Sequence, residues 1–333
     1  MVTNTVAIDA MSGDFGPRVI IPSTLQYLQG NPGTRVVFVG KTDAIEPLIN
    51  RRFAHRVDVV HASEIIGMDE VPSQALRHKK DSSIHVAVDL VKNGLASACL
   101  SAGNTGALMG VSKIKLRTID GVDRPAICGA VPSLESHSYL LDMGANVDCS
   151  AEHLLQFAIM ASVMARALDG KVSPTVALLN NGEEDTKGNH QVKEASELLA
   201  AKECLNYIGF IEGHRIFEAV ADIIVCDGFV GNIALKASEG VATYIMDKIR
   251  KEIKSDPVTR LLSWFAIPEF RRVSSKVDPR RLNGAVLLGL KGVVVKSHGH
   301  ADQLAFGYAL EYAYRMLSVD IVSQLDQEFQ SLV

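Results

Sequence analysis

The sequence predicts an α/β protein built on a largely parallel sheet that helices cover. Two observations lead to this class. Short apolar runs rich in Val, Ile and Leu alternate along the chain with longer segments that have helical patterns. Polar, glycine-containing loops follow five of the short runs, just before a helix or turn.

The expected strands come first in each strand–helix unit and are short. They cover residues 6–11, 35–40, 57–62, 97–102, 139–144, 175–180, 205–210, 222–227 and 292–297. The expected helices lie between or after them and cover residues 82–94, 151–169, 189–202, 232–253 and 302–322. The alternation of strands and helices is interrupted once, at the basic segment of residues 256–281, which contains Pro257, Pro268 and Pro279.

Composition places the chain among globular proteins. With 333 residues, 47% of them hydrophobic, folding buries roughly three quarters of the surface that the unfolded chain exposes, which excludes a disordered or collagen-like protein. The length suits two domains or one large α/β domain. A net charge of -4 argues against a surface devoted to nucleic acid. Residues 248–281 carry ten basic and four acidic residues, which indicates an anionic partner or a solvated face.

The cysteines and the hydropathy pattern predict a soluble cytosolic protein. The five cysteines form no C-x-x-C pair, which fits a reducing compartment. The chain enters its first expected strand without the basic and apolar regions of a signal peptide. The longest uncharged stretch, residues 93–112, holds too many Ser, Asn and Gly residues to span a bilayer.

The five strand-end loops are the places where we expect function. They are DAMSGDFGP (9–17), SAGNTGALM (101–109), LDMGANVD (141–148), LLNNGEEDTKGN (178–189) and CDGFVGN (226–232). In open α/β sheets, ligands bind outside the carboxyl ends of the strands. We therefore expect all five loops to build one site.

The SAGNTGALM loop has the features of an anion cradle. Gly103 and Gly106 allow a tight turn, and the N–H groups near Asn104 and Thr105 point outward from a helix N-terminus. A tight turn with a capping Asn or Thr explains the same residues. The chain contains neither G-x-G-x-x-G nor G-x-x-x-x-G-K-[ST], so no motif supports dinucleotide or nucleoside triphosphate binding.

Two single residues have a functional and a structural interpretation. Lys187 is either a surface lysine in an acidic loop or a point charge for a phosphate or an oxyanion. Asn232 is either a helix cap or an amide donor to a carbonyl oxygen.

His298 and His300 lack further ligands at metal-binding spacing, so we expect no metal and instead a helix cap near Asp302. No nucleophile motif is present.

At these same residues the sequence closely resembles the PlsX family, bacterial phosphate acyltransferases that convert acyl carrier protein thioesters and inorganic phosphate into acyl phosphates for phospholipid synthesis. The matching stretches run in order from residue 9 to residue 299. They are DAMSGDFGP, PSQALRHKKDSS, SAGNTGALMG, DRPAI, LLDMGANVDC, EEDTKGN, CDGFVGNIALKASEG and LNGAVLLGLKGVVVKSHG. Ser12 stands where the family has Gly in DAMGGD, and Asn181 stands where LLNIG is usual.

The resemblance implies a homodimer with a three-layer α/β/α fold similar to isopropylmalate dehydrogenase and phosphotransacetylases. Residues 1–333 would form a single domain with two lobes around a cleft, from which a helical hairpin at residues 240–280 projects. It also implies no redox cofactor. Lys187 and Asn232 correspond to the catalytic pair. The phosphate loop would comprise Ser101, Gly103, Asn104 and Thr105, and the cleft would be lined by Asp9, Met11, Gly13, Asp14, Asp142 and Asp227.

The implied reaction needs no protein nucleophile, because phosphate itself attacks the thioester. The enzyme would hold phosphate with the SAGNTG backbone and Lys187, while Asn232 donates to the carbonyl oxygen and a pantetheine thiolate leaves. A phosphotransacetylase-like enzyme acting on acyl coenzyme A has the same chemistry, so sequence physics does not separate the two donors. A metal-dependent dehydrogenase and a non-catalytic acyl or carrier-protein binding module are further alternatives.

The resemblance also implies partners at the membrane. PlsX-like proteins associate peripherally with the cytoplasmic face of the membrane, where a glycerol-3-phosphate acyltransferase consumes the product. Residues 257–270 form an apolar stripe suited to an anionic membrane surface, or else to a dimer interface or core: Leu261, Leu262, Trp264 and Phe265. The basic residues that we expect to steer the acidic carrier protein are Arg271, Arg272, Lys276, Arg280 and Arg281.

Overall fold

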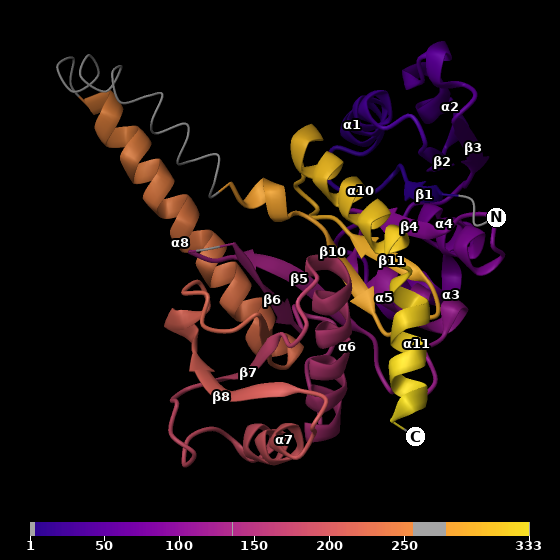
Figure 1. Ribbon diagram of the computed structural model, residues 1–333. Helices are drawn as coiled ribbons and strands as arrows, with labels where there is room; N and C mark the ends of the chain where they lie inside the picture. Colours follow the sequence, from indigo (N-terminus) through magenta and orange to yellow (C-terminus); the bar gives the residue numbers. More distant parts are fainter. Residues whose placement is uncertain (1–3, 135, 256–277, 333) are drawn as a thin grey trace.

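A computed structural model describes residues 4–134, 136–255 and 278–332. Its centre is an 11-stranded sheet with the strand order β3-β2-β1-β4-β11-β10-β5-β6-β9-β7-β8, flanked by helices (Figure 1). The strands are β1 (Thr5–Asp9), β2 (Arg35–Gly40), β3 (Val57–His61), β4 (Ala98–Ser101), β5 (Ala126–Pro132), β6 (His137–Leu141), β7 (Thr175–Asn180), β8 (Asn206–Glu212), β9 (Ile223–Val225), β10 (Ala285–Leu288) and β11 (Val293–Lys296). All nine expected strands are confirmed.

The helices cover both faces of the sheet. They are α1 (Pro17–Gly30), α2 (Thr42–Ile45), α3 (Pro72–His78), α4 (Ser83–Lys92), α5 (Thr105–Leu116), α6 (Ala151–Asp169), α7 (His190–Ala200), α8 (Gly228–Ser255), α10 (Gln303–Ser318) and α11 (Ile321–Ser331). The expected helix at residues 302–322 is two helices, because the backbone at Asp320 takes a φ of 45° between α10 and α11.

Alternation along the central strands produces three layers. In β1, Val6 and Ile8 pack into a core with α1, α6 and α10, whereas Ala7 faces a second core with α4 and α5. Because both faces are covered, β1 is buried over its whole length. The three-layer α/β/α architecture is therefore confirmed.

The sheet consists of two parallel halves that run in opposite directions. Strands β1, β2, β3, β4 and β11 are mutually parallel, as are β6, β7, β8 and β9. Between the halves, β10 is antiparallel to both β11 and β5, and β5 is antiparallel to β6. The sequence pattern did not predict β5 and β10. The first includes Gly129 and Pro132, and the second has only four residues.

Helix α8 projects away from the sheet (Figure 1). It ends at Ser255, so most of the expected hairpin lies outside the described residues, as do the four expected membrane-contact residues Leu261, Leu262, Trp264 and Phe265. Within the described ranges, no helix combines the length and the apolar character that crossing a bilayer requires.

Candidate active site

Buried side chains tie together the loops that follow β1 and β4. The hydroxyl of Ser101 donates to Asp9 Oδ2 (2.7 Å) and accepts from the N–H of Gly103 (3.0 Å). Ser12 donates to the Asp9 carbonyl (2.7 Å) and accepts from the N–H of Ala102 (2.9 Å). Ser12, one of the two departures from the family pattern, therefore joins the two loops rather than disturbing them.

Asn104 begins α5, and all of its side-chain atoms have structural partners. Its Oδ1 accepts from the N–H of Ala107 (3.0 Å), so it caps the helix. Its Nδ2 donates to the carbonyls of Met68 (2.8 Å) and Glu70 (3.0 Å). The capping interpretation is thus confirmed, and the side chain of Asn104 has no atom left for an anion.

The backbone at the start of α5 provides hydrogen-bond donors for an anion, which the side chain of Asn104 does not. Within the described part of the chain, the N–H groups of Asn104, Thr105 and Gly106 have no hydrogen-bond acceptor. Gly106 is exposed and Thr105 is half-buried, so an anion can reach this turn from solvent. Unpaired N–H groups at a helix N-terminus attract anions through both hydrogen bonds and the helix dipole.

Segment 64–82 packs over this helix start and holds it in place. A Cβ at Gly106 would lie only 2.7 Å from Cγ of Pro72, so the glycine allows α3 to approach α5 closely. Glu70 accepts from the N–H of Gly67 (2.9 Å) and forms an ion pair with Lys79, whose ammonium also donates to the Ile65 carbonyl (2.7 Å). These contacts fix the Met68 and Glu70 carbonyls that bind Asn104.

Lys296, at the end of β11, is a further candidate residue that the sequence pattern did not indicate. It lies opposite Ser101 in the β4–β11 register, and its ammonium donates to the carbonyls of Ala102 (3.4 Å) and Ser297. Burial lowers its pKa to about 8, while the charge of Asp9 opposes that shift. The available signal was a lysine closing an apolar strand inside one of the matching stretches.

Asp9 is buried beneath the same loop. Burial raises the pKa of its carboxyl group, and the hydroxyls of Ser83 and Ser101, the Met11 backbone and the Lys296 charge oppose the shift. Asp9 therefore lies within the protein beside the loop and does not line an open surface. The side chain of Met11 packs against Gly40 instead, where an added Cβ would lie 2.4 Å from its Cγ.

Asp14 and His300 lie at the outer side of these loops. The N–H of Asp14 donates to the Gly299 carbonyl (3.0 Å), and the Asp14 carboxylate forms an ion pair with His300. Gly13 approaches the same carbonyl so closely that an added Cβ would lie 2.9 Å from it. Among the described residues, no group of His, Cys, Asp and Glu side chains has a metal-binding arrangement. Asp302 caps α10 as expected.

In the second half-sheet, Asp142 organises the loop that follows β6. Its two carboxylate oxygens accept backbone hydrogen bonds from residues 127, 144, 145 and 146 at 2.7–3.1 Å, and one from the Asn146 side chain at 2.9 Å. Burial raises the pKa of Asp142, and these hydrogen bonds oppose the shift. Asp142 is fully buried, so its role in the structure is to shape the loop.

Asn232 lies on α8, four residues beyond the helix start. Asp227 is the capping residue, because its Oδ1 accepts from the N–H of Val230 (2.8 Å), so the capping interpretation of Asn232 is wrong. The half-buried Asn232 side chain lies against Gly144, where an added Cβ would be 3.4 Å from the Asn232 Cβ. Its amide forms no hydrogen bond within the described ranges.

Lys187 is exposed on the loop after β7. Its backbone N–H donates to the Glu184 carbonyl (2.9 Å), and the next N–H, of Gly188, donates to Asn181 Oδ1 (3.0 Å). The second departure from the family pattern, Asn181, therefore closes this loop. The Lys187 ammonium has no ion pair with any residue that the structure describes, whereas neighbouring Glu183 is paired with Arg215.

The five loops do not all leave from one edge of the sheet, so that a single site built from all of them stays a prediction. Because β6, β7 and β9 run opposite to β1 and β4, the loops at their carboxyl ends leave from the other edge of the sheet. The loops therefore form two groups, and no hydrogen bond or ion pair between described side chains joins the groups. The sequence did not indicate this reversal, which the missed antiparallel strands β5 and β10 produce.

Comparison with known proteins identifies the family. A model of the family described as fatty acid synthesis protein matches residues 4–324. The phosphate acyltransferase of Methylococcus capsulatus is 52% identical over 93% of this chain and 92% of that protein. The phosphate acyltransferase of Pseudomonas paraeruginosa is 48% identical over the whole of both chains. The chain belongs to the phosphate acyltransferase family. Members of this family are acyltransferases, so the chain is an enzyme and the two loop groups are candidates for its active site.

Solved structures support the same fold. A phosphotransacetylase from Streptococcus pyogenes superposes with a TM-score of 0.60 at 15% identity, covering 94% of each chain. A branched-chain phosphotransacylase from Enterococcus faecalis gives 0.56 at 16% identity, covering 94% of this chain and 99% of that one. A putative 4-hydroxythreonine-4-phosphate dehydrogenase from Salmonella typhimurium gives 0.51 at 14% identity, with the same coverage. The family's fold is thus shared with both transacylases and dehydrogenases.

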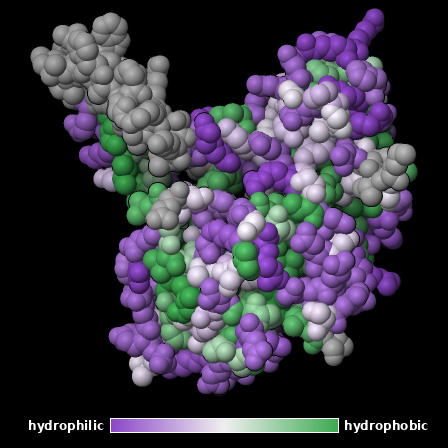
Figure 2. Space-filling view, in the orientation of Figure 1, coloured by the Kyte–Doolittle hydropathy of each residue, from purple (hydrophilic) through white to green (hydrophobic). Residues whose placement is uncertain are grey.

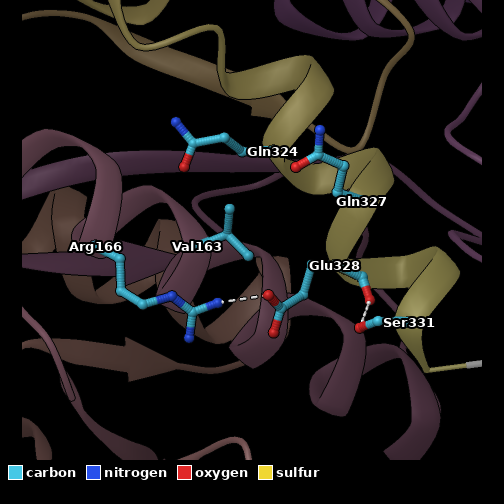
Figure 3. A pocket seen from close by; sticks show the side chains of 6 residues that line it. All are labelled: Val163, Arg166, Gln324, Gln327, Glu328 and Ser331. Atoms are coloured by element: carbon cyan, nitrogen blue, oxygen red, sulfur yellow. Dashed lines mark hydrogen bonds and ion pairs between the residues drawn. The ribbon is translucent and has the colours of Figure 1, made fainter.

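A polar hollow of about 230 Å³ between α6 and α11 is separate from these loops (Figure 3). Arg166 and Glu328 point toward each other across it and form an ion pair at 2.8 Å. Its lining residues include no member of either loop group. The ion pair satisfies the charges in the hollow, and we assign it a structural role.

Proposed function

We propose that the protein transfers a fatty acyl group from an acyl carrier protein thioester to inorganic phosphate. The observation that carries this proposal is the start of α5, where the N–H groups of residues 104–106 are unpaired and accessible. These groups suit a phosphate ion, and phosphate acyltransferases of known sequence align with the chain from end to end.

The proposed mechanism places a phosphate ion on this helix N-terminus, above the Lys296 ammonium. A phosphate oxygen attacks the thioester carbonyl carbon, the C–S bond breaks, and the thiolate leaves and takes a proton from solvent. Positioning of the two reactants supplies on the order of 7–11 kcal/mol of the rate enhancement. We assign Lys187 and Asn232 to the developing oxyanion, because both have polar groups without partners among the described side chains. This assignment requires that the two loop groups, which leave from opposite edges of the sheet, both reach the thioester.

The supporting features for a homodimer lie on α8. Its exposed apolar side chains are too large and too many for a solvated helix, and apolar side chains are visible along α8 in Figure 2. They are Phe229, Val230, Ile233, Val241, Tyr244 and Ile245. We propose that a second copy of the chain covers part of this face of α8.

We further propose that the acyl phosphate product is released at the cytoplasmic face of the membrane, where a glycerol-3-phosphate acyltransferase consumes it.

The first experiment mixes the protein with phosphate and either palmitoyl acyl carrier protein or palmitoyl coenzyme A, and detects palmitoyl phosphate by mass spectrometry. We expect product from both donors, with a higher kcat/KM for the carrier protein. Product from coenzyme A alone would instead support the phosphotransacetylase-like activity. Acyl binding without any phosphate-dependent product would support the non-catalytic module.

A second experiment tests the basic segment as the carrier-protein contact. Of its residues, Arg280 is already paired with Asp278 (2.6 Å) and Asp302 (2.8 Å), whereas Arg281 lies over the ring of Tyr308. Charge reversal at Arg271 and Arg272, which lie outside the described residues, should raise the KM for the carrier thioester and reduce its salt dependence. An unchanged KM would remove both residues from the contact.

A third experiment tests the membrane contact. Leu261→Asp with Trp264→Asp should abolish binding to vesicles that contain anionic lipid, while acyl phosphate formation in solution persists. Unfolding or loss of the dimer in this double variant, measured by thermal melting and sedimentation, would instead assign the two residues to the core or interface.

A further inference from the structure

A serine, a histidine and an aspartate form a chain of hydrogen bonds beside the turn between β5 and β6. The hydroxyl of Ser136 lies 3.1 Å from Nδ1 of His137. Nε2 of the same ring lies 3.2 Å from Oδ2 of Asp169, the last residue of α6. In this arrangement a base activates a nucleophile while a third group orients the base. The phosphate reaction proposed above uses none of the three residues.

The charge of Asp169 decides which atoms donate. Burial acts to raise the pKa of its carboxyl group. Hydrogen bonds from His137 and Tyr139, together with the charge of Arg315, outweigh this effect and hold that pKa below its usual value. Because an ionised carboxylate only accepts hydrogen bonds, Nε2 of His137 carries the proton and Nδ1 presents its lone pair. The Ser136 hydroxyl therefore donates to Nδ1, which is the direction that general-base catalysis requires.

Helix stability does not explain the position of Asp169. A carboxylate in the last turn of a helix is opposed by the helix dipole, which favours cations there. Its two oxygens instead contact His137 and, at 3.9 Å, Arg315. The ring of His137 also packs edge-on against Tyr139, with 4.9 Å between the ring centres. The base and the group that orients it are therefore held in place.

Exposure decreases along this chain of hydrogen bonds, from the nucleophile inward. Ser136 is exposed, whereas the His137 side chain is 23% exposed and the Asp169 side chain is 14% exposed. The N–H of Ser133 donates to the Ser136 carbonyl (3.2 Å) and closes the turn. Leu134, in the same turn, is 85% exposed and offers an apolar surface to an acyl group.

This site is separate from both loop groups. It lies at the amino end of β6, and the loop that contains Asp142 lies at the carboxyl end of the same strand. In the sheet order β6 is four strands from β4, which carries the proposed phosphate turn. Neighbouring strands are about 4.8 Å apart, so the two strands lie roughly 19 Å apart.

We propose that Ser136 is the nucleophile of a second activity, the hydrolysis of carboxylic esters of small acids. The Ser136 oxygen bonds to the ester carbonyl carbon while its proton passes to Nδ1 of His137. The C–O bond of the ester breaks, and that proton moves to the departing alcohol. Water then attacks the acyl-serine with the same base, which releases the acid and restores Ser136. Asp169 is a positioning residue, since it contacts His137 and not the ester.

The first test labels the protein with a fluorophosphonate, which reacts with base-activated serines, and locates the label by peptide mass spectrometry. We expect label on Ser136 and none on Ser318, an exposed serine whose hydroxyl donates to the Arg315 carbonyl (2.8 Å). His137→Gln should slow the labelling of Ser136 at least about 100-fold, the loss expected for a positioned base. Labelling of Ser136 no faster than that of Ser318 would overturn the proposal.

Hydrolysis of p-nitrophenyl acetate measures the activity itself. Ser136→Ala should lower kcat/KM at least about 100-fold, and the control Ser318→Ala should not change it. Both variants should form acyl phosphate at the wild-type rate, because the esterase site is independent of the phosphate reaction. Equal ester hydrolysis by the wild type and Ser136→Ala would overturn the activity, whatever the outcome for acyl phosphate.

The pH profile tests the role of Asp169. Ester hydrolysis should fall in acid as His137 takes up a proton, and the ionisable groups that contact this base or its carboxylate are Asp169, Tyr139 and Arg315. In Asp169→Asn the fall should move to lower pH, because a neutral amide no longer stabilises the protonated ring. An unmoved profile in folded Asp169→Asn would overturn the positioning role. Thermal melting verifies folding, and Ser136→Ala, at an exposed position, decides the proposal if Asp169→Asn unfolds.

Discussion

The two groups of strand-end loops use their polar side chains in different ways. After β1 and β4, the side chains of Asp9, Ser12, Ser101 and Asn104 are buried and bind one another or the backbone. After β7 and β9, Lys187 is exposed and Asn232 has an unpaired amide in the described structure. The first group therefore presents backbone N–H groups above hydrogen-bonded side chains, whereas the second group, in which Asp142 is also buried and hydrogen-bonded, presents the free side chains of Lys187 and Asn232.

We propose that this difference separates phosphate binding, by the first group, from stabilisation of the oxyanion, by the second. A tetrahedral anion of fixed shape is well served by a rigid backbone turn, because the N–H groups need no reorganisation when it binds. A developing oxyanion is served by side chains that are not already committed.

Removal of Lys187 should have the largest effect. Lys187→Ala is expected to lower kcat by roughly 10²–10³, the usual cost of one lost electrostatic contact to the transition state, with little change in Tm because the side chain is exposed. Single-turnover acyl phosphate formation measures this. Lys193→Ala, an exposed lysine on α7, is the control. Near wild-type turnover in Lys187→Ala would show that Lys187 does not stabilise the oxyanion.

Lys296 should act on phosphate binding rather than on the carbonyl. Lys296→Met is expected to raise the KM for phosphate about 10- to 100-fold, as loss of a charged contact does. Lys291→Met is the control, since Lys291 lies five residues earlier and pairs with Asp120 at the surface. A loss confined to kcat, with the phosphate KM unchanged, would move Lys296 into the catalytic group.

Titration of the Lys296 ammonium gives a second test of its role in phosphate binding. Its pKa of about 8 lies below the value of about 10.4 for an unfolded lysine, so between these pH values the unfolded chain binds more protons. The contribution of Lys296 to the free energy of unfolding therefore increases from about pH 8 to about pH 10.4. Phosphate affinity should fall as pH rises through about 8, because the ammonium is lost. A flat phosphate KM across this range would argue against a charged Lys296 in the site.

Ser101 should show a smaller effect that includes stability. Ser101→Ala removes the hydroxyl that joins Asp9 to Gly103, and we expect a phosphate KM about tenfold higher together with a lower Tm. Ser112 on α5 is the matched control, because its buried hydroxyl has no partner within the described structure. Ser112→Ala should leave KM and Tm within error. Equal behaviour of the two variants would show that the bond to Asp9 does not support the loop.

Chelation should have the smallest effect. His300 is paired with Asp14, and the described residues contain no metal-binding group, so dialysis against a strong chelator should leave the rate unchanged. Inductively coupled plasma analysis of the dialysed enzyme provides the check on metal content. A rate that chelation abolishes and zinc restores would make the loops after β1 and β11 a metal site.

Nine of the strands, the covering of the sheet by helices and two of the helix caps could be predicted from the sequence alone. Short apolar runs that alternate with helical patterns predicted nine strands, and Asn104 and Asp302 were identifiable as helix caps from their neighbours alone. These features are local, because a cap or a strand pattern depends on residues within a few positions.

Which loops lie at the same edge of the sheet, and which side chains lack hydrogen-bond partners, became clear from the three-dimensional packing. The reversal between the half-sheets depends on the pairing of β10 with β5, some 160 residues apart, and periodicity carries no information on strand direction. The amide group of Asn104 has hydrogen-bond partners because segment 64–82 folds over it. Lys296 lies beside Ser101 because β11 pairs with β4. Such contacts follow from the packing of distant segments, so they appear only when the whole core is assembled.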